Sequence, residues 1–429
     1  MRLKPVIAAF LILLSAPILG NVSVTTLPSG LKVIVREGHE TNLVGVDIWV
    51  KAGSVNETTL NNGLSHLTEH MIFKATSKYG PGEIDRQIEG VGAELNGGTS
   101  KDWVHFYTTV ASEYLPTALD VLSDALINPQ FRAEDIEKER QIIVDEIARS
   151  DSDPIQLSYR LFCETAFSSH PYRLAAMGMR ESVSKLTRED LSAYYKQRYL
   201  PATTCIVIAG DVSKSDAVAL VERVFSAYQG SGKEQSNPKD ELAIASPRVK
   251  RFASPTKQAY VMLGYIGPPA SQFKEACAVD VMMAVLGNTY RGRLSAVLTA
   301  GGVHFNSISA DFITQRNPAL ATALISVEPG EVDKVQSILA SEFRKLGEGV
   351  PFAELEQAKR SVEGADLFDQ ETFSGQARAL GLYESIGSHE MALNYGSTVR
   401  GLIETDVTST ARKLFGPGNY CVVILEPAQ

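Results

Sequence analysis

The residues of this sequence that are best suited to chemistry are His66, Glu69 and His70, in the stretch His-Leu-Thr-Glu-His. Residues four apart in a helix lie on nearly the same face, so both imidazoles can point at one ion, with Glu69 close to it. Two histidines and a carboxylate from elsewhere, with one open coordination position, form a catalytic zinc site. The spacing H-x-x-E-H is the inverted form of the H-E-x-x-H zinc motif, and it predicts metal-assisted hydrolysis.

A third ligand is expected from a carboxylate on a rigid element, because loops place ligands less accurately. The charged segment 134–150 has apolar residues at helical spacing and contains Glu139 and Glu146. These two glutamates are seven residues apart, which is two helical turns, so they share a face. Either could reach the ion while the other lies beside it, and the spacing alone does not choose between them.

The elements around these residues are a mixture of strands and helices. Runs rich in β-branched residues predict strands at 31–36, 44–52 and 203–209, and a hairpin over 94–110. Within that hairpin, Asn96-Gly97-Gly98 is a turn or bulge signal. Apolar periodicity predicts helices, the first of which carries both histidines, at 64–74, 84–90, 115–126, 134–150, 156–166, 188–198 and 214–228.

The second half of the chain repeats the first. Phe352 echoes Phe131 and Cys421 echoes Cys205, at offsets of 221 and 216 residues. A near-constant offset over several elements indicates a duplicated domain. We therefore predict an α/β (α+β) fold of two homologous domains, each a mixed sheet packed with helices. The predicted parts are a catalytic zinc domain at 21–228, a linker at 229–245 and a domain without metal at 246–429.

The two halves differ in the helix that would hold the metal. Residues 276–286, which correspond to the histidine-bearing helix, contain neither His nor Glu, and Glu275 lies just before them. We infer that the first half carries the chemistry and that the second half is the same scaffold put to another use.

Composition and the N-terminal segment narrow the classes of function. The 429 residues carry a net charge of −9, which argues against nucleic acid as a partner. Arg2 and Lys4 precede an apolar run from Val6 to Leu19 that is too short to span a bilayer comfortably. This pattern predicts a removed signal peptide over 1–20, with an uncleaved anchor as the alternative. We expect an exported, periplasmic protein with no stable membrane span after signal removal.

The cysteines give no sign of a metal site. They are widely spaced and form no C-x-x-C pair, which excludes the usual cysteine zinc patterns. Export would permit a disulfide, but two of the four lie in apolar strand-like runs, so we expect buried free thiols at Cys163, Cys205, Cys277 and Cys421.

Several segments together resemble the pitrilysin-type, or M16, family of zinc peptidases. The matching segments are His66-x-x-Glu69-His70 within Gly63–Lys74, Gly92–Asn96, and Arg198–Pro201 leading to Gly210-Asp211. The resemblance covers nearly the whole chain after the N-terminal segment, including its duplication. It implies one Zn²⁺ held by His66, His70 and Glu146, with Glu139 orienting a ligand and Glu69 activating water at the zinc as general base.

The family also binds its peptide substrate as an added strand on a sheet edge. The matching edge in this chain is Asn96-Gly97-Gly98, where Gly97 departs from the Ala that the family usually has. An ordinary hairpin turn is the alternative reading of these three residues.

The second half departs from the family at a functional position. Catalytic members usually carry an Arg and a Tyr there that stabilise the oxyanion, whereas this chain has Thr299 and Phe305. Three interpretations remain open: a homologous partner chain supplies the pair, His304 replaces it in part, or the chain has little or no activity. We expect an exported zinc endopeptidase paired with a homologous subunit, in a hetero-oligomer or a homodimer. The alternative is a non-catalytic, peptidase-like scaffold subunit of a complex.

Overall fold

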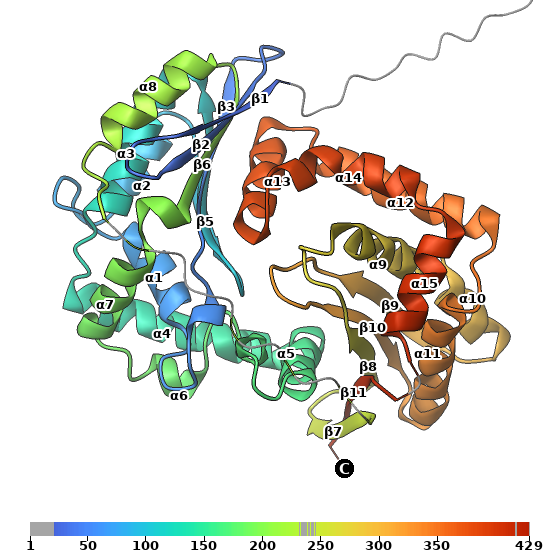
Figure 1. Ribbon diagram of the computed structural model, residues 1–429. Helices are drawn as coiled ribbons and strands as arrows, with labels where there is room; N and C mark the ends of the chain where they lie inside the picture. Colours follow the sequence, from blue (N-terminus) through green and yellow to red (C-terminus); the bar gives the residue numbers. More distant parts are fainter. Residues whose placement is uncertain are drawn as a thin grey trace, which may run out of the picture.

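The structure is a computed structural model, and it describes residues 21–230, 232, 238, 241, 244, 246–416 and 418–428. The predicted signal peptide at 1–20 and much of the predicted linker at 229–245 lie outside the described residues. The described part of the chain forms two α/β halves that face each other (Figure 1). In this part, no helix is long and apolar enough to cross a membrane.

The first half is built on a six-stranded mixed sheet with the order β1-β2-β6-β3-β5-β4. Only β2 and β6 are parallel; the other neighbours are antiparallel. Valine and isoleucine dominate β2, β3 and β6, and all seven residues of β6 are buried, as expected of a strand covered on both faces. The strands are β1 (Val22–Thr26), β2 (Lys32–Glu37), β3 (Leu43–Val50), β4 (Leu95–Thr99), β5 (Val104–Ala111) and β6 (Thr204–Gly210).

Helices cover this sheet and close its core, which gathers side chains from β2, β3, β5, β6 and most of the helices of this half. The histidine-bearing helix is α1, and the charged helix predicted at 134–150 is α4, which runs two residues further at its C-terminal end. The helices are α1 (Leu64–Ile72), α2 (Glu83–Glu89), α3 (Leu115–Ile127), α4 (Ala133–Ser152), α5 (Pro154–Ala166), α6 (Arg180–Val183), α7 (Arg188–Arg198) and α8 (Lys214–Val224).

The second half repeats this topology. Its five-stranded sheet has the order β7-β11-β8-β10-β9, with β7 and β11 parallel and the remaining neighbours antiparallel. The pattern corresponds strand by strand to β2-β6-β3-β5-β4, so the predicted fold of two duplicated halves is confirmed. The strands are β7 (Arg248–Ser254), β8 (Ala259–Ile266), β9 (Phe305–Phe312), β10 (Leu320–Val327) and β11 (Cys421–Pro427).

The helices of the second half follow the same order as those of the first. The counterpart of α1 is α9, and the counterpart of α4 is α12. The helices are α9 (Phe273–Leu286), α10 (Arg293–Ala300), α11 (Val332–Leu346), α12 (Phe352–Asp369), α13 (Phe373–Ile386), α14 (Glu390–Gly401) and α15 (Glu404–Leu414).

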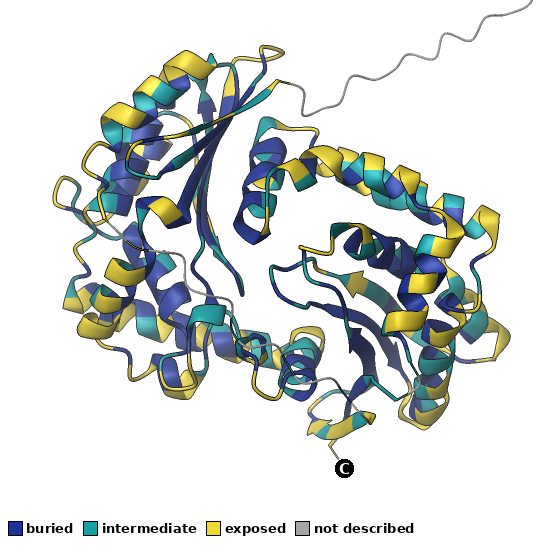
Figure 2. Ribbon diagram, viewed as in Figure 1, coloured by how far each residue is buried: buried dark blue, intermediate teal, exposed yellow. Residues whose placement is uncertain are grey.

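The two halves exchange one helix each. Helix α13 of the second half packs on β3 and β6, and α5 of the first half packs on β11 and β8 (Figure 1). At the first of these contacts Gly381 meets the Trp49 ring so closely that a β-carbon would lie 2.1 Å from its Nε1. Lys32 of β2 and Glu384 of α13 form an ion pair across the same contact. Each sheet is therefore buried on both faces, which fixes how the halves meet (Figure 2).

The segment Asn96-Gly97-Gly98 lies within β4 and not in the turn of the hairpin. The turn follows at Ser100–Trp103, where the Ser100 N–H donates to the Trp103 carbonyl over 2.8 Å. The interpretation of this segment as a turn is therefore wrong. Glycine is used here because β-carbons would crowd neighbouring side chains, Glu69 at Gly97 and His105 at Gly98.

All four cysteines are buried and none is in a disulfide, as expected from the sequence. Two of them, Cys163 and Cys421, lie in the apolar cluster where α5 packs on the second sheet. Their role there is that of small apolar side chains.

Candidate metal centre

Helix α1 is held at its start by a buried carboxylate. Glu57 accepts hydrogen bonds from the backbone N–H groups of Gly63, over 2.8 Å, and Ser65, over 2.7 Å. The first N–H groups of a helix have no partner within the helix, so this carboxylate satisfies them and fixes the start of α1. Leu64, Leu67 and Met71 bury the opposite side of α1. The chemistry-bearing side chains are therefore directed away from the core.

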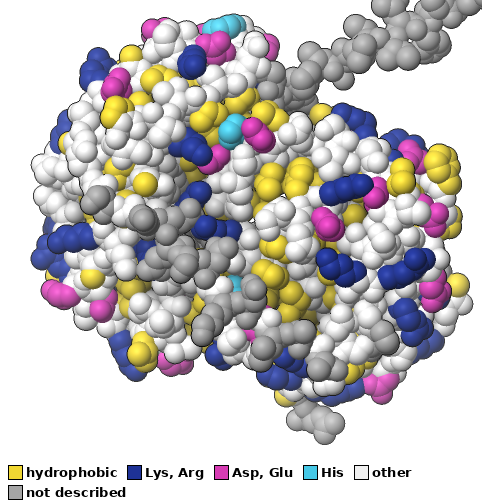
Figure 3. Space-filling view, in the orientation of Figure 1, with side chains coloured by type: hydrophobic (Ala, Val, Ile, Leu, Met, Phe, Trp, Pro, Cys, Tyr) yellow, Lys and Arg dark blue, Asp and Glu magenta, His cyan; other side chains and the backbone are white. Residues whose placement is uncertain are grey.

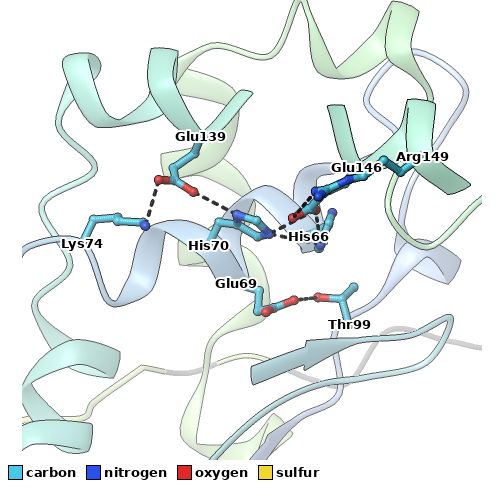
Figure 4. A network of polar contacts seen from close by, with 8 residues as sticks. All are labelled: His66, Glu69, His70, Lys74, Thr99, Glu139, Glu146 and Arg149. Atoms are coloured by element: carbon cyan, nitrogen blue, oxygen red, sulfur yellow. Dashed lines mark hydrogen bonds and ion pairs between the residues drawn. The ribbon is translucent and has the colours of Figure 1, made fainter. Parts of the chain in front are cut away.

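Three potential ligand atoms meet between α1 and α4 (Figure 4). The Nε2 atoms of His66 and His70 lie 3.2 Å apart. The Oε2 atom of Glu146 lies 3.8 Å from the first and 3.7 Å from the second. The side chains come from adjacent turns of α1 and from the C-terminal half of α4, which packs against α1.

This arrangement fits a zinc ion. With bonds of about 2.0–2.1 Å in a tetrahedral site, zinc holds its ligand atoms about 3.3 Å apart. The three observed separations lie close to that value. All three residues are partly exposed, so the fourth position can face solvent or a substrate. In the described part of the chain, no other group of His, Cys, Asp and Glu side chains converges in this way.

Glu139 contacts His70 at Nδ1, the ring nitrogen that faces away from the ion position. Its Oε2 lies 2.9 Å from Nδ1 of His70, and its Oε1 lies 2.8 Å from Nζ of Lys74. A carboxylate on Nδ1 fixes the tautomer of His70 so that Nε2 faces the ion position. Burial would raise the pKa of Glu139, but His70 and Lys74 outweigh it and the pKa is lowered.

The two histidines differ in their electrostatic surroundings. Burial, aided by the charge of His70, lowers the pKa of His66 to about 4, so this imidazole stays neutral at ordinary pH. Burial would also lower the pKa of His70. The hydrogen bond to Glu139 and the charges of Glu69 and Glu146 act in the opposite direction, and the pKa is raised. Metal binding requires both imidazoles to be neutral, so His70 is the more proton-sensitive of the two potential ligands.

Glu69 is not part of the ligand cluster. Its Oε2 accepts a hydrogen bond of 2.7 Å from the Thr99 hydroxyl at the end of β4. Burial raises the pKa of Glu69, and the Thr99 hydrogen bond opposes this only in part. A carboxylate with a raised pKa next to an ion position is suited to accept a proton from water.

The strand β4 borders this site and forms an edge of its sheet. It pairs with β5 on one side only. Asn96 and Gly97 are exposed, and Gly98 is half-buried. An open strand edge presents unpaired N–H and C=O groups to which an extended peptide can add.

Sequence reasoning missed three residues that the structure brings to this site, Glu57, Lys74 and Thr99. Strand alternation could have indicated Thr99, since it lies two residues after Gly97 and so on the same face of β4. Glu57 and Lys74 depend on how loops and helices meet in space, for which the sequence carries no short-range signal.

The second half contains no counterpart of the cluster among its described residues. Helix α9, the counterpart of α1, carries Asp280, whose side chain accepts a hydrogen bond of 2.8 Å from the Tyr395 hydroxyl. Thr299 is exposed on α10, and its hydroxyl donates to the Ser295 carbonyl over 2.8 Å. Phe305 begins β9, and His304 is exposed just before it.

Two family models match the chain in the order of its two halves. "Insulinase (Peptidase family M16)" matches residues 32–179, and "Peptidase M16 inactive domain" matches residues 185–362. Similar sequences include an uncharacterised zinc protease of Mycobacterium leprae, 29% identical over 89% of this chain and 84% of the relative. A probable mitochondrial-processing peptidase subunit beta of Arabidopsis thaliana is 26% identical over 88% of this chain and 72% of the relative.

Solved structures share the fold over nearly the whole chain. A protease from Helicobacter pylori matches with a TM-score of 0.87 at 22% identity, over 95% of this chain and 99% of that one. A structure from Pseudomonas fluorescens described as a peptidase M16 inactive domain matches with a TM-score of 0.85 at 21% identity, with the same coverage. The two family models match the two halves in order, and similar sequences are named as zinc proteases. This chain therefore belongs to the M16 peptidase family.

Proposed function

We propose that this chain is a zinc-dependent endopeptidase that hydrolyses peptides or unfolded segments. The observation that carries the proposal is the convergence of His66, His70 and Glu146 at separations of 3.2–3.8 Å, with Glu69 beside them and the open edge of β4 next to Glu69. Three potential ligands, a carboxylate suited to act as a base and an open strand edge therefore lie together, and this supports the proposal.

Each residue has a defined part in the proposed reaction. Zinc bound by these three ligands would polarise the scissile carbonyl and lower the pKa of water. Glu69 takes the proton from the attacking water and passes it to the leaving amine. Glu139 holds His70 in the tautomer that leaves Nε2 free for the ion. Thr99 holds the Glu69 carboxylate in place through its hydroxyl.

The peptide is held by β4. Main-chain hydrogen bonds to the open edge at Asn96, Gly97 and Gly98 align an extended segment without reading its sequence. Only an unfolded segment can supply a free strand, so folded proteins are poor substrates.

The oxyanion donors are the part of the site that this chain lacks. Thr299 and Phe305 stand where the family has Arg and Tyr. Losing one such donor lowers the rate by about a hundredfold or more. We propose that a homologous M16-like subunit supplies the pair in a hetero-oligomer, since a second copy of this chain carries the same Thr and Phe. We further propose that the chain is exported to the periplasm after removal of residues 1–20.

A scaffold subunit without activity is the second candidate, and the Thr299 and Phe305 substitutions favour it. The test measures zinc content and cleavage of a quenched, unstructured peptide by the purified chain, alone and with an M16-like protein from the same organism that carries the Arg and Tyr. Stoichiometric zinc and activity that requires the mixture and vanishes in Glu69→Gln support the proposal. Stoichiometric zinc without activity in either preparation would contradict the endopeptidase and support the scaffold subunit.

A further inference from the structure

A buried histidine–carboxylate pair lies in the first sheet and takes no part in the metal centre. Nδ1 of His105 on β5 lies 3.0 Å from Oδ1 and 3.3 Å from Oδ2 of Asp47 on β3. Asp47 is 2% exposed and His105 is 7% exposed. Replacing such a buried pair by apolar side chains is often neutral or stabilising, so stability alone does not explain why the pair is there.

The His105 ring is held in one orientation. Asp47 fixes its Nδ1 edge, and three aromatic rings pack around it. The ring centroids lie 4.3 Å from that of Trp49, 5.0 Å from that of Tyr107 and 5.1 Å from that of Trp103. Within the described part of the chain, Nε2 has no hydrogen-bond partner, so this atom is left to bind a further group.

Nε2 of His105 lies over the open edge of the sheet. His105 pairs with Gly98 across β5 and β4, and a β-carbon at Gly98 would lie 3.0 Å from Nε2. Because Gly98 has no side chain, the imidazole can lean over β4, which has no neighbouring strand on its other side. Side chains alternate along a strand, so the edge has Glu69 on the face of Gly97 and His105 on the face of Gly98.

This second face of β4 is directed toward the second half of the chain. Helix α13 covers the same face of the sheet, but it packs on β3 and β6, which are two and three strands away from β4. On this face of β4, Asn96 is exposed and Gly98 is half-buried. Figure 3 shows hydrophobic side chains gathered along the seam between the halves. The imidazole therefore offers a hydrogen bond in largely apolar surroundings.

We infer that His105, oriented by Asp47, recognises one side chain of a peptide that pairs with β4. The residue opposite Gly98 would place its Cβ about 4.5–5.5 Å from the β-carbon position of Gly98, so a short polar side chain reaches Nε2. A hydroxyl can donate to a bare Nε2 and accept from a protonated one, whereas a carboxylate only accepts. The inference rests on the proposed function and names the substrate class: extended segments with Ser or Thr opposite Gly98.

The test measures binding and does not require hydrolysis. The full chain with Glu69→Gln is titrated into short, unstructured, fluorescein-labelled peptides, and fluorescence anisotropy compares Thr with its isostere Val at each central position. We expect one position at which the Thr peptide binds about tenfold more tightly, because Val leaves Nε2 desolvated and without a partner.

Variants in the same Glu69→Gln chain assign this preference to His105. His105→Asn removes Nε2, and its amide can still donate to Asp47 from the position of Nδ1, so we expect the Thr preference to be lost. The control is His39→Asn in the loop after β2, since His39 also pairs with a carboxylate, that of Asp211, over 2.7 Å. It should keep the preference. If thermal unfolding shows that His105→Asn does not fold, the double variant Asp47→Val with His105→Phe, which replaces the pair by apolar side chains, takes its place.

Equal binding of the Thr and Val peptides at every position would overturn the inference and leave the proposed function standing. So would a Thr preference that persists without Nε2 or is lost equally in His39→Asn. A preference that depends on His105, together with no hydrolysis by the native chain in any pairing, would refute the peptidase and leave the recognition of Thr. Failure of every peptide to bind would overturn both.

Discussion

Gly97 of β4 faces the carboxylate of Glu69: a β-carbon at this position would lie 3.0 Å from Oε1 and 3.2 Å from Cγ of that side chain. The edge strand and the proposed general base are thus in direct contact. Because Gly97 has no side chain, the Glu69 carboxylate can lie directly against the backbone of β4. This contact makes the geometry of Glu69 sensitive to the residue at position 97.

Enlarging position 97 is therefore expected to impair the base without removing the metal. Gly97→Ala requires a shift of a few tenths of an ångström and is expected to lower kcat/KM by no more than about threefold. Gly97→Val displaces Glu69 further and is expected to cost about a hundredfold, in line with the effect of misplacing a catalytic group by about 1 Å. Steady-state kinetics on a quenched peptide and zinc analysis measure the two effects.

Gly98→Val serves as the matched control, because a β-carbon there meets His105 and not Glu69. If both valine variants lost activity equally, the loss would come from strand pairing and not from the base.

Removing the carboxylate behind His70 is expected to weaken metal binding. In Glu139→Gln the His70 imidazole loses the charged partner at Nδ1 that fixes its tautomer and leaves Nε2 free for the ion. We expect zinc affinity to fall by about 10- to 100-fold, which is the usual effect of removing the hydrogen-bond partner of a metal ligand. Competition with a chromophoric chelator measures it. Glu137→Gln, on the exposed face of the same helix, should bind zinc like the native chain.

The ion pair between the halves is expected to make stability depend on acid pH. Burial would raise the pKa of Glu384, but hydrogen bonds from His389 and Lys32 outweigh it and lower the pKa to about 2. The unfolded chain has the ordinary value of about 4.3. Stabilisation by Glu384 is therefore complete above the unfolded pKa and is lost as the pH falls through about 4 toward 2.

Thermal unfolding at pH 5.5 and pH 3 tests this. Glu384→Gln should lower Tm at pH 5.5, and the difference from the native chain should shrink at pH 3. The exposed Glu371 provides the control, Glu371→Gln, which should leave Tm unchanged at both values. A Tm difference for Glu384→Gln that stays constant with pH would contradict the assignment.

The close approach of α13 to the first sheet is expected to be intolerant of any side chain. In Gly381→Ala the new β-carbon overlaps the buried Trp49 ring, and we expect a loss of about 1–3 kcal/mol in the free energy of unfolding. Gly364→Ala is the control within a neighbouring helix, since nothing lies within 4 Å of its β-carbon. It should be neutral or stabilise by up to about 1 kcal/mol. Urea unfolding followed by tryptophan fluorescence measures both variants.

The sequence by itself determined the features that depend on local periodicity. His66 and His70 share a face of α1 because four residues make about one helical turn, whatever surrounds the helix. The duplication was likewise readable, since Cys205 and Cys421 recur within matching apolar strands. A mixed fold of two similar halves followed from these patterns, and the topologies of the two sheets bear it out.

Only the tertiary structure decided the features that depend on where elements cross. Glu139 and Glu146 share one face of α4, and the angle at which α4 meets α1 brings Glu146 to both Nε2 atoms and Glu139 to Nδ1. Asn96-Gly97-Gly98 has the local chemistry of a turn, but pairing with β5 and contact with Glu69 make it an edge strand. The exchange of α5 and α13 arises from contacts between elements that lie far apart in the sequence. Such contacts leave no period in the sequence, because they are set by packing and not by the repeat of a single element.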